Sequence, residues 1–143
     1  MPPDFLQTVG VNIGLIAAYA VLGALLMYVG YFAIDLTTPG DLRALVRGGM
    51  PNAVVVTGAG LVSMAFIVIT AVYVSPGGFV GVLYTLIYGF VGIVAQVVAV
   101  RGLEAMSRID VGDCLHAERY TPVSAAIAAM HGALGLVVAV AII

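Results

Sequence analysis

The sequence predicts an all-α integral membrane protein with four transmembrane helices, built as two parallel helix-elbow-helix repeats. Two observations support this fold class. Of the 143 residues, 63% are apolar and only 8% are charged. No charged residue occurs between Asp4 and Asp35, between Arg47 and Arg101, or after Arg119. These runs are long enough to cross a bilayer, since a hydrocarbon core about 30 Å thick needs about 20 apolar helical residues.

The first and the last uncharged run each hold one span, whereas the middle run is too long for a single helix. Residues 75–78 divide it, because the sequence Ser-Pro-Gly-Gly favours a turn over a continued helix. The whole chain, residues 1–143, is therefore expected to form a single transmembrane domain. Its four spans are expected at residues 11–33, 52–73, 79–100 and 121–143.

The basic residues predict the orientation of the chain. They occur only in or beside the two loops at residues 34–51 and 101–120, namely as Arg43, Arg47, Arg101, Arg108 and Arg119. Because loops rich in Lys and Arg stay in the cytoplasm, we expect both loops on that side of a cytoplasmic (inner) membrane. Both ends of this multi-pass chain are then expected outside. Acidic residues nearly neutralise the loops, which argues against a polybasic lipid-binding patch.

The chain also repeats itself. Shifting it by 72 residues superimposes Asp41 on Asp113 and Arg47 on Arg119. These matches are informative because charges are scarce in this chain. Repeat one would cover residues 11–74 and repeat two residues 79–143. Each copy would contain two spans, an even number. Both copies are therefore expected to have the same orientation in the membrane, as parallel repeats.

Each loop is expected to form an elbow with a short interfacial helix. In the first elbow, Thr38 is expected to cap a helix with Pro39 first and Asp41 third. In the second, Asp110 and Asp113 occupy the corresponding positions. The elbows either only shape the hairpins or have a function, which would be docking a cytoplasmic partner or gating. The candidate elbow positions are Thr38, Asp41, Arg43, Arg47, Asp110, Asp113 and Arg119.

Three polar side chains are expected within the spans and are candidates for function. His131 lies near the middle of the fourth span, Gln96 nearer the cytoplasmic end of the third, and Asn52 at the start of the second. Two readings of His131 stay open, a neutral imidazole that joins helices and a group that handles protons or ions. Its candidate partners at comparable depth are Tyr19, Ser63, Thr85 and Tyr88. No deep carboxylate is expected, which weakens the case for an ion-coupled pump.

Small residues recur at four-residue intervals, the spacing that lets membrane helices approach closely. The three ridges are Gly10, Gly14 and Ala18, then Gly81, Thr85 and Gly89, and finally Ala125, Ala129 and Ala133. They predict tight packing, either inside the bundle or between subunits. Four short spans leave little room for a central cavity in one protomer, so a homo-oligomer is the expected functional unit.

Motifs for catalysis are absent from the sequence. It has no paired-His zinc motif, no phosphate-binding Gly loop and no lysine, and Cys114 with His116 makes a poor metal site. We therefore expect no enzyme activity, no cofactor and no metal ion. A nucleic-acid partner is not expected either, because the basic footprint is missing. The expected partners are the lipid bilayer, with a second copy and a cytoplasmic protein as open alternatives.

Three short segments resemble a known family. They are residues 35–42 (Asp-Leu-Thr-Thr-Pro-Gly-Asp-Leu), 48–53 (Gly-Gly-Met-Pro-Asn-Ala) and 58–61 (Gly-Ala-Gly-Leu). This pattern resembles the YjfL-type family of small bacterial inner-membrane proteins, the domain of unknown function number 350. Its members look like four-helix proteins with two copies of a two-helix unit. Here Met50 and Pro51 separate Gly49 from Asn52, and the second copy has Ser124 instead of the asparagine.

The resemblance implies a fold and a compartment but no chemistry. We therefore expect a structural or interaction component of the cytoplasmic membrane, one that assembles as an oligomer and presents its elbows to a partner. The alternative is a small homo-oligomeric ion channel or transporter that uses Asn52, Gln96 and His131 near a helix or subunit interface.

Overall fold

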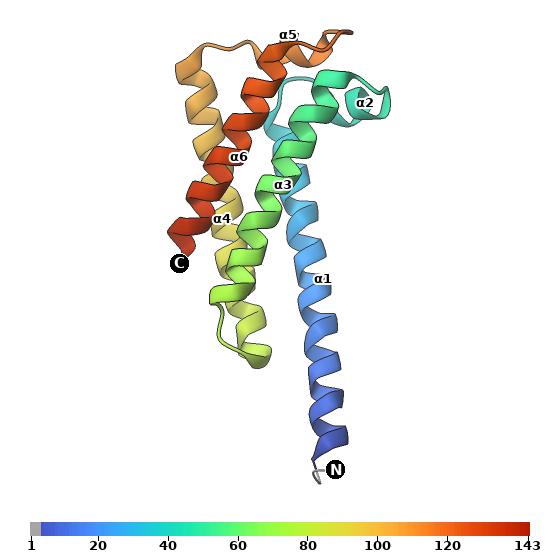
Figure 1. Cartoon of the computed structure of the whole chain (residues 1–143), viewed down its shortest axis with the longest axis vertical. Coiled ribbons are helices and arrows are strands. Elements are labelled where there is room, and N and C mark those ends of the chain that lie inside the picture. The colour runs from blue at the N-terminus through green and yellow to red at the C-terminus, as the bar shows by residue number, and fades with distance from the viewer. Residues whose placement is uncertain (1–3) are drawn as a thin grey trace.

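The computed structural model describes residues 4–143, which form four long helices and two short ones (Figure 1). All four long helices are long and apolar enough to cross a membrane, as the sequence predicts. The helices in chain order are α1 (Phe5–Thr37), α2 (Leu42–Arg47), α3 (Pro51–Val74), α4 (Gly78–Ser107), α5 (Val111–His116) and α6 (Pro122–Ile142).

Two of the long helices extend well beyond the expected spans. α1 was expected over residues 11–33 and α4 over residues 79–100, whereas they cover Phe5–Thr37 and Gly78–Ser107. In α4, an ion pair of 2.7 Å between Arg101 and Glu104, one helical turn apart, stabilises the added turns. The helix ends only at Arg108, whose backbone is left-handed with φ 55°. The charged second elbow therefore begins on the last turns of α4.

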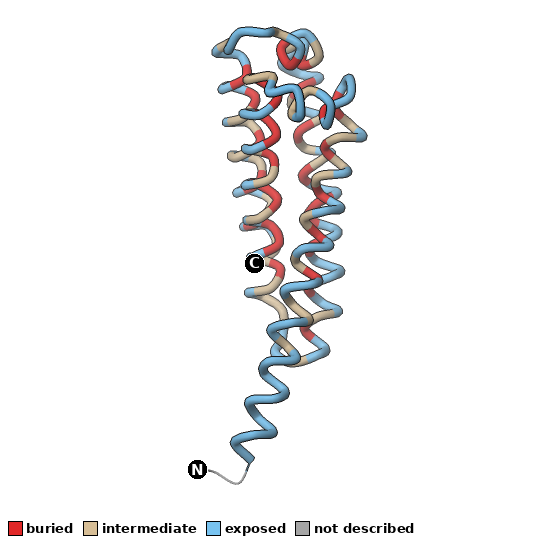
Figure 2. The backbone as a smooth tube through the Cα atoms, turned by 90° about the vertical axis from the view of Figure 1, so that its right-hand side faces the viewer, coloured by how far each residue is buried: buried red, intermediate tan, exposed pale blue. Residues whose placement is uncertain are grey.

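The long helices form one bundle with α3 at its centre. α3 packs against α1, α4 and α6, and most extensively against α6. Figure 2 shows the buried residues along the inner faces of the helices, with exposed residues on the outer faces. The exposed residues include many large apolar side chains, such as Ile69 and Val137, with 63% and 65% of their surface exposed. An apolar outer face suits a bundle surrounded by lipid.

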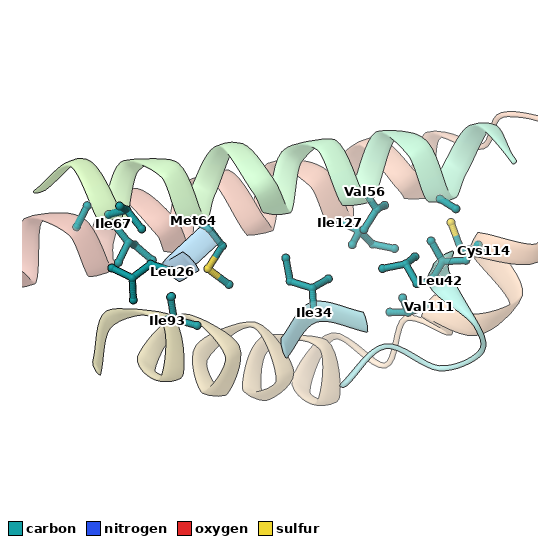
Figure 3. Packing of buried hydrophobic residues seen from close by; sticks show 14 of the residues in the cluster. Leu26, Ile34, Leu42, Val56, Met64, Ile67, Ile93, Val111, Cys114 and Ile127 are labelled. Carbon is teal, nitrogen blue, oxygen red and sulfur yellow. The ribbon is translucent and has the colours of Figure 1, made fainter. Parts of the chain in front are cut away.

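Apolar side chains fill the interior at two levels. Midway along the helices, Leu26, Met64, Ile67 and Ile93 lie close together from α1, α3 and α4 (Figure 3). Towards α2 and α5, a second group brings Leu42 and Val111 beside Cys114 and other buried residues of the same cluster. Each short helix is thus held to the end of the bundle by a buried apolar side chain.

The two elbows lie side by side at one end of the bundle (Figure 1). Gly40 of the first elbow packs against His116 of the second, since a Cβ atom on Gly40 would lie 2.9 Å from the imidazole ring of His116. Pro39 similarly lies beside Gly112. We call the surface formed by residues 38–51 and 101–121 the elbow face.

Each short helix begins after an aspartate that caps it. The Asp41 carboxylate accepts a hydrogen bond of 2.9 Å from the Ala44 amide, and the Asp110 carboxylate accepts one of 3.0 Å from the Asp113 amide. The expected cap at Asp110, with Asp113 third in the helix, is therefore confirmed. The expectation that Thr38 caps the first elbow helix and that Asp41 is the third residue of this helix is wrong.

The physical reason lies at the end of α1. The Thr38 hydroxyl donates a 2.7 Å hydrogen bond to the Ile34 carbonyl, so Thr38 ends α1 instead of starting α2. Gly40 then turns the chain with φ 91°, which prevents a helix from beginning at Pro39. In the elbow helices, Asp41 thus corresponds to Asp110, a shift of 110 − 41 = 69 residues and not 72. The duplication of the chain stays a prediction.

α1 extends past the opposite end of the bundle. The Tyr19 hydroxyl donates a 3.3 Å hydrogen bond to the Gly78 carbonyl, so α1 passes the α3–α4 turn at Tyr19. Residues 4–18 project beyond the turn (Figure 1), and Leu6 and Ile16 have 81% and 69% of their surface exposed. We call residues 4–18 the α1 overhang. At 1.5 Å per residue, the 33 residues of α1 measure roughly 50 Å, more than the hydrocarbon core of a bilayer.

Candidate functional site

Three polar side chains meet inside the bundle: Ser63 of α3, Gln96 of α4 and His131 of α6. Their exposed fractions are 0%, 0% and 3%. All three lie on the faces by which their helices pack together, because the neighbouring positions on those faces are also buried. We call these residues the interior polar cluster. The sequence singled out His131 and Gln96, and named Ser63 as a partner of the histidine.

Hydrogen bonds hold the interior polar cluster together. The Gln96 amide nitrogen donates to the Ser63 hydroxyl oxygen at 2.8 Å and to the His131 carbonyl oxygen at 3.0 Å. The Ser63 hydroxyl donates to the same carbonyl at 2.8 Å. The cluster therefore joins α3, α4 and α6 through the backbone of His131 and not through its ring.

Two polar atoms of the cluster have no hydrogen-bond partner among residues 4–143. They are the Gln96 side-chain oxygen Oε1 and the His131 ring nitrogen Nδ1, and both are fully buried. The other expected partners of His131 lie elsewhere. Tyr19 bonds the Gly78 carbonyl, and Thr85 bonds the Ser75 hydroxyl at 3.0 Å. Tyr88 is 36% exposed.

A small cavity adjoins the interior polar cluster. It offers about 10 Å³ to the centre of a water-sized molecule. Gln96 and His131 line it together with apolar side chains of α1, α3 and α4, and Thr37 and Arg101 line it as well. Arg101 has 29% of its side chain exposed. The polar end of the cavity therefore lies towards the elbow face.

Asn52 lies apart from this cluster and holds the second elbow against α3. Its amide nitrogen donates to the carbonyls of Ala117 and Arg119 at 3.0 and 2.9 Å, and its amide oxygen accepts from the Thr121 amide at 2.9 Å. The residue is completely buried. Asn52 thus joins the start of α3 to the end of the second elbow. The sequence did not predict this contact.

Glycines allow the helices that carry the cluster to approach each other. A Cβ atom on Gly135 would lie 2.8 Å from the Cβ of Ser63, so α6 packs directly on α3 at this level. The ridge in α4 has the same role inside the bundle, because a Cβ on Gly89 would lie 2.6 Å from Leu26. Around Gly10 and Gly14 nothing lies within 4 Å of an added Cβ. The ridge in α6, Ala125, Ala129 and Ala133, is exposed.

The arginines of the elbow face differ in their partners. Arg43 pairs with Asp35 at 2.8 Å and lies 5.7 and 5.5 Å from the ring centres of Tyr31 and Phe32. Arg101 pairs with Glu104 and donates to the Thr38 hydroxyl at 3.3 Å. The three exposed arginines without a carboxylate within 4 Å in residues 4–143 are Arg47, Arg108 and Arg119.

A groove of about 380 Å³ runs between the first elbow and the end of α4. Pro39, Ile109 and Val111 supply apolar surface to it, and Arg101, Glu104 and Asp110 supply charge. The sequence did not single out Arg101 and Glu104 as a pair, because both were expected in a loop. Their spacing of three residues, with opposite charges, is the available signal for a continued helix.

The candidate elbow residues do not converge on one chemical centre. Asp41 and Asp110 cap helices. Thr38 is hydrogen-bonded to Ile34 of α1 and to Arg101 of α4, and Arg43 pairs with Asp35. Arg47 and Arg119 are exposed. Within residues 4–143, no three His, Cys, Asp or Glu side chains gather where they could hold a metal ion. Cys114 is buried, with its sulfur 3.4 Å from the Thr121 hydroxyl.

Comparisons with known proteins agree with this architecture. The family described as Domain of Unknown Function (DUF350) matches residues 6–142. A UPF0719 transmembrane protein of Mycolicibacterium paratuberculosis is 35% identical over 129 residues, which cover 87% of this chain and 83% of the relative. A UPF0719 transmembrane protein of Mycobacterium bovis is 39% identical over 69 residues, 45% of each chain. No solved structure matches. The chain, a multi-pass membrane protein with four apolar helices, belongs to the DUF350 family.

Proposed function

We propose that this chain is an interaction component of the cytoplasmic membrane, and that its elbow face binds a protein partner inside the cell. The main support is the charge distribution on that face. Arg47, Arg108 and Arg119 are exposed and have no carboxylate partner among the described residues. The positive-inside rule puts such arginines on the cytoplasmic side. By contrast, the polar groups inside the bundle mostly bond one another.

The groove on the elbow face indicates what kind of partner would fit. Its apolar lining from Pro39, Ile109 and Val111 suits an apolar side chain, and its charged lining consists of Arg101, Glu104 and Asp110. The elbow face exposes three arginines without a carboxylate partner, and it also exposes the acids Asp41, Asp110, Asp113 and Glu118. A peptide segment with an apolar anchor and flanking charges of both signs is therefore the proposed ligand of the elbow face.

We also propose that the chain assembles with further copies of itself. The α1 overhang has no neighbour in the bundle, and Gly10 and Gly14 leave open space beside it. Small residues one helical turn apart are typical of helix pairs in membranes. Gln7, Thr8 and Asn12 are exposed on the same segment and offer hydrogen bonds to a second helix.

A homo-oligomeric ion channel or transporter is the second candidate, because Gln96 and His131 line a common cavity. Within one protomer this cavity does not continue across the bundle, since Leu26, Ile67 and Ile93 fill the next level and are at most 2% exposed. A pore would therefore have to form between protomers. Cysteine crosslinking between the α1 overhangs of neighbouring protomers tests that premise.

The partner proposal is tested by photo-crosslinking in intact cells. A photoreactive amino acid in place of Arg47 should give an adduct with one cytoplasmic protein. The substitutions Arg108→Glu and Arg119→Glu should reduce that adduct several-fold, because they replace the positive partners of the segment's acidic groups with repelling charges. An adduct that is unaffected by both substitutions, or no adduct at all, would contradict the proposal.

Two controls make the result specific. The same photoreactive residue in place of Tyr73, 83% exposed beside the α3–α4 turn at the other end of the bundle, should not give the same adduct. The second control uses cells that carry the double substitution Met106→Cys and Cys114→Ser. An impermeant thiol reagent should label the cysteine at position 106 only after the membrane has been permeabilised. Met106 is 81% exposed, whereas the native Cys114 is buried and would report poorly.

A further inference from the structure

The interior polar cluster leaves two buried polar atoms without a partner, on two side chains that line one cavity. Gln96 and His131 both line it, and Gln96 Oε1 and His131 Nδ1 have no partner in residues 4–143. Polar groups that are fully buried almost always bond either protein or an ordered water molecule. The two unpartnered atoms therefore point to a ligand with hydrogen-bonding capacity.

The hydrogen bonds fix the orientation of the Gln96 amide. The His131 carbonyl can only accept, so the Gln96 atom 3.0 Å away from it has to be the nitrogen. Ser63 donates its hydroxyl hydrogen to the same carbonyl and can only accept from Gln96. Both hydrogens of the Gln96 amide are thus engaged with Ser63 and His131. Its oxygen is held as an acceptor on the side away from them.

The size of the cavity limits the ligand. Its volume of about 10 Å³ for the centre of a water-sized molecule is close to the minimum that one water molecule requires. Arg101, with its partly exposed side chain, and Thr37 line the cavity as well. Met64, which also lines the cavity, and Ile67, further along the same helix, are at most 1% exposed. Only a water-sized polar molecule fits, and it would enter from the elbow face.

We propose that this cavity is a binding site for a single water molecule that bridges Gln96 Oε1 and His131 Nδ1. The water donates one hydrogen to the glutamine oxygen. Towards the imidazole it either donates or accepts, according to which ring nitrogen carries the hydrogen. This site is independent of the proposed elbow partner, because it lies inside the bundle.

The site can be tested by solid-state NMR on the full chain in lipid bilayers, with histidine labelled by ¹⁵N. Transfer of magnetisation from water protons to the His131 ring should be detected in the wild type. Gln96→Leu removes the glutamine acceptor at similar side-chain size and should reduce the transfer several-fold. Unchanged transfer in Gln96→Leu, or no transfer in the wild type, would overturn the proposal.

Thr57→Val is the matched control. The Thr57 hydroxyl is also buried without a partner among the described residues, but Thr57 does not line the cavity. Its removal should leave the transfer to His131 unchanged, and a loss as large as that in Gln96→Leu would count against a specific site. If Gln96→Leu fails to fold, a high-resolution experimental map of the wild type decides. Density within hydrogen-bond distance of both atoms supports the site, and its absence there refutes it.

Discussion

At the scale of single residues, Asn52 makes the clearest stability prediction. Asn52→Ala removes hydrogen bonds to Ala117, Arg119 and Thr121 from a completely buried position. A net contribution of about 1 kcal/mol for each bond, partly recovered by water at the elbow face, predicts a loss of about 2 kcal/mol. The free energy of unfolding, measured by detergent titration with SDS, checks this value.

Asn12→Ala is the control for this prediction. Asn12 carries the same side chain but is exposed on the α1 overhang. In protein diluted to the monomer, where no second copy contacts the overhang, its replacement should change the free energy of unfolding by less than about 0.5 kcal/mol. Hydrogen exchange adds a local measurement, because only Asn52→Ala should speed exchange at residues 117–121. Equal losses of stability in both variants would show that the bonds of Asn52 contribute little.

The sequence could identify these polar residues but not their tasks. Asn52 and His131 stood out because polar side chains are rare in apolar spans, and Ser63 entered only as a partner of the histidine. The atoms that Asn52 bonds lie 65 to 69 residues away in the chain. No local pattern encodes such a separation. For the same reason, the sequence could not show that Ser63 and Gln96 bond the His131 backbone while the ring faces a cavity.

At the scale of helices, the contact between α3 and α6 depends on a glycine. Gly135→Ala would bring a methyl group 2.8 Å from the Cβ and 3.0 Å from the Cα of Ser63. Because the latter atom belongs to the backbone, the helices would have to move apart. Overpacking of this kind costs about 1–3 kcal/mol. We expect that loss in the free energy of unfolding, together with weaker bonds between Ser63, Gln96 and His131.

Gly132→Ala provides a control on the same helix. Nothing lies within 4 Å of a Cβ atom on Gly132, so the added methyl group meets no neighbour. Its effect on the free energy of unfolding should be close to zero, or slightly stabilising because alanine favours a helix more than glycine does. If both variants lost the same stability, the cause would be the helix itself and not its contact with α3.

Element boundaries were predictable where a breaker is present and less so elsewhere. The Ser-Pro-Gly-Gly sequence at residues 75–78 does separate α3 from α4. α3 and α6 begin at Pro51 and Pro122, each within one residue of the expected span starts at residues 52 and 121. The extra turns of α4 were missed because its charged residues suggested a loop. The cap at Asp41 was missed because Thr38 and Pro39 form a plausible helix start, which the hydrogen bond from Thr38 to Ile34 excludes.

At the scale of the whole molecule, the spacing of charges was sufficient to predict four apolar helices. The α1 overhang was not predictable in the same way, because it depends on where α1 meets the other helices. A hydrogen bond between Tyr19 and Gly78 sets that level. The overhang leaves Leu6, Ile13 and Ile16 without a neighbour in the bundle, at 81%, 61% and 69% exposure. A segment so apolar requires either lipid or another protein surface around it.

Self-association through the α1 overhang is tested by cysteine crosslinking. In a Cys114→Ser background, Gly14→Cys should form disulfide-linked dimers in oxidised membranes, because paired helices approach most closely at small residues. Ile69→Cys is the control, since Ile69 is 63% exposed on α3, a different helix. It should crosslink much less.

Gly14→Ile should also lower the oligomeric state of the protein in mild detergent, because a branched side chain separates the helices. Equal crosslinking at both positions would indicate random collisions, and a monomer without crosslinks would remove both the oligomer and the channel between protomers.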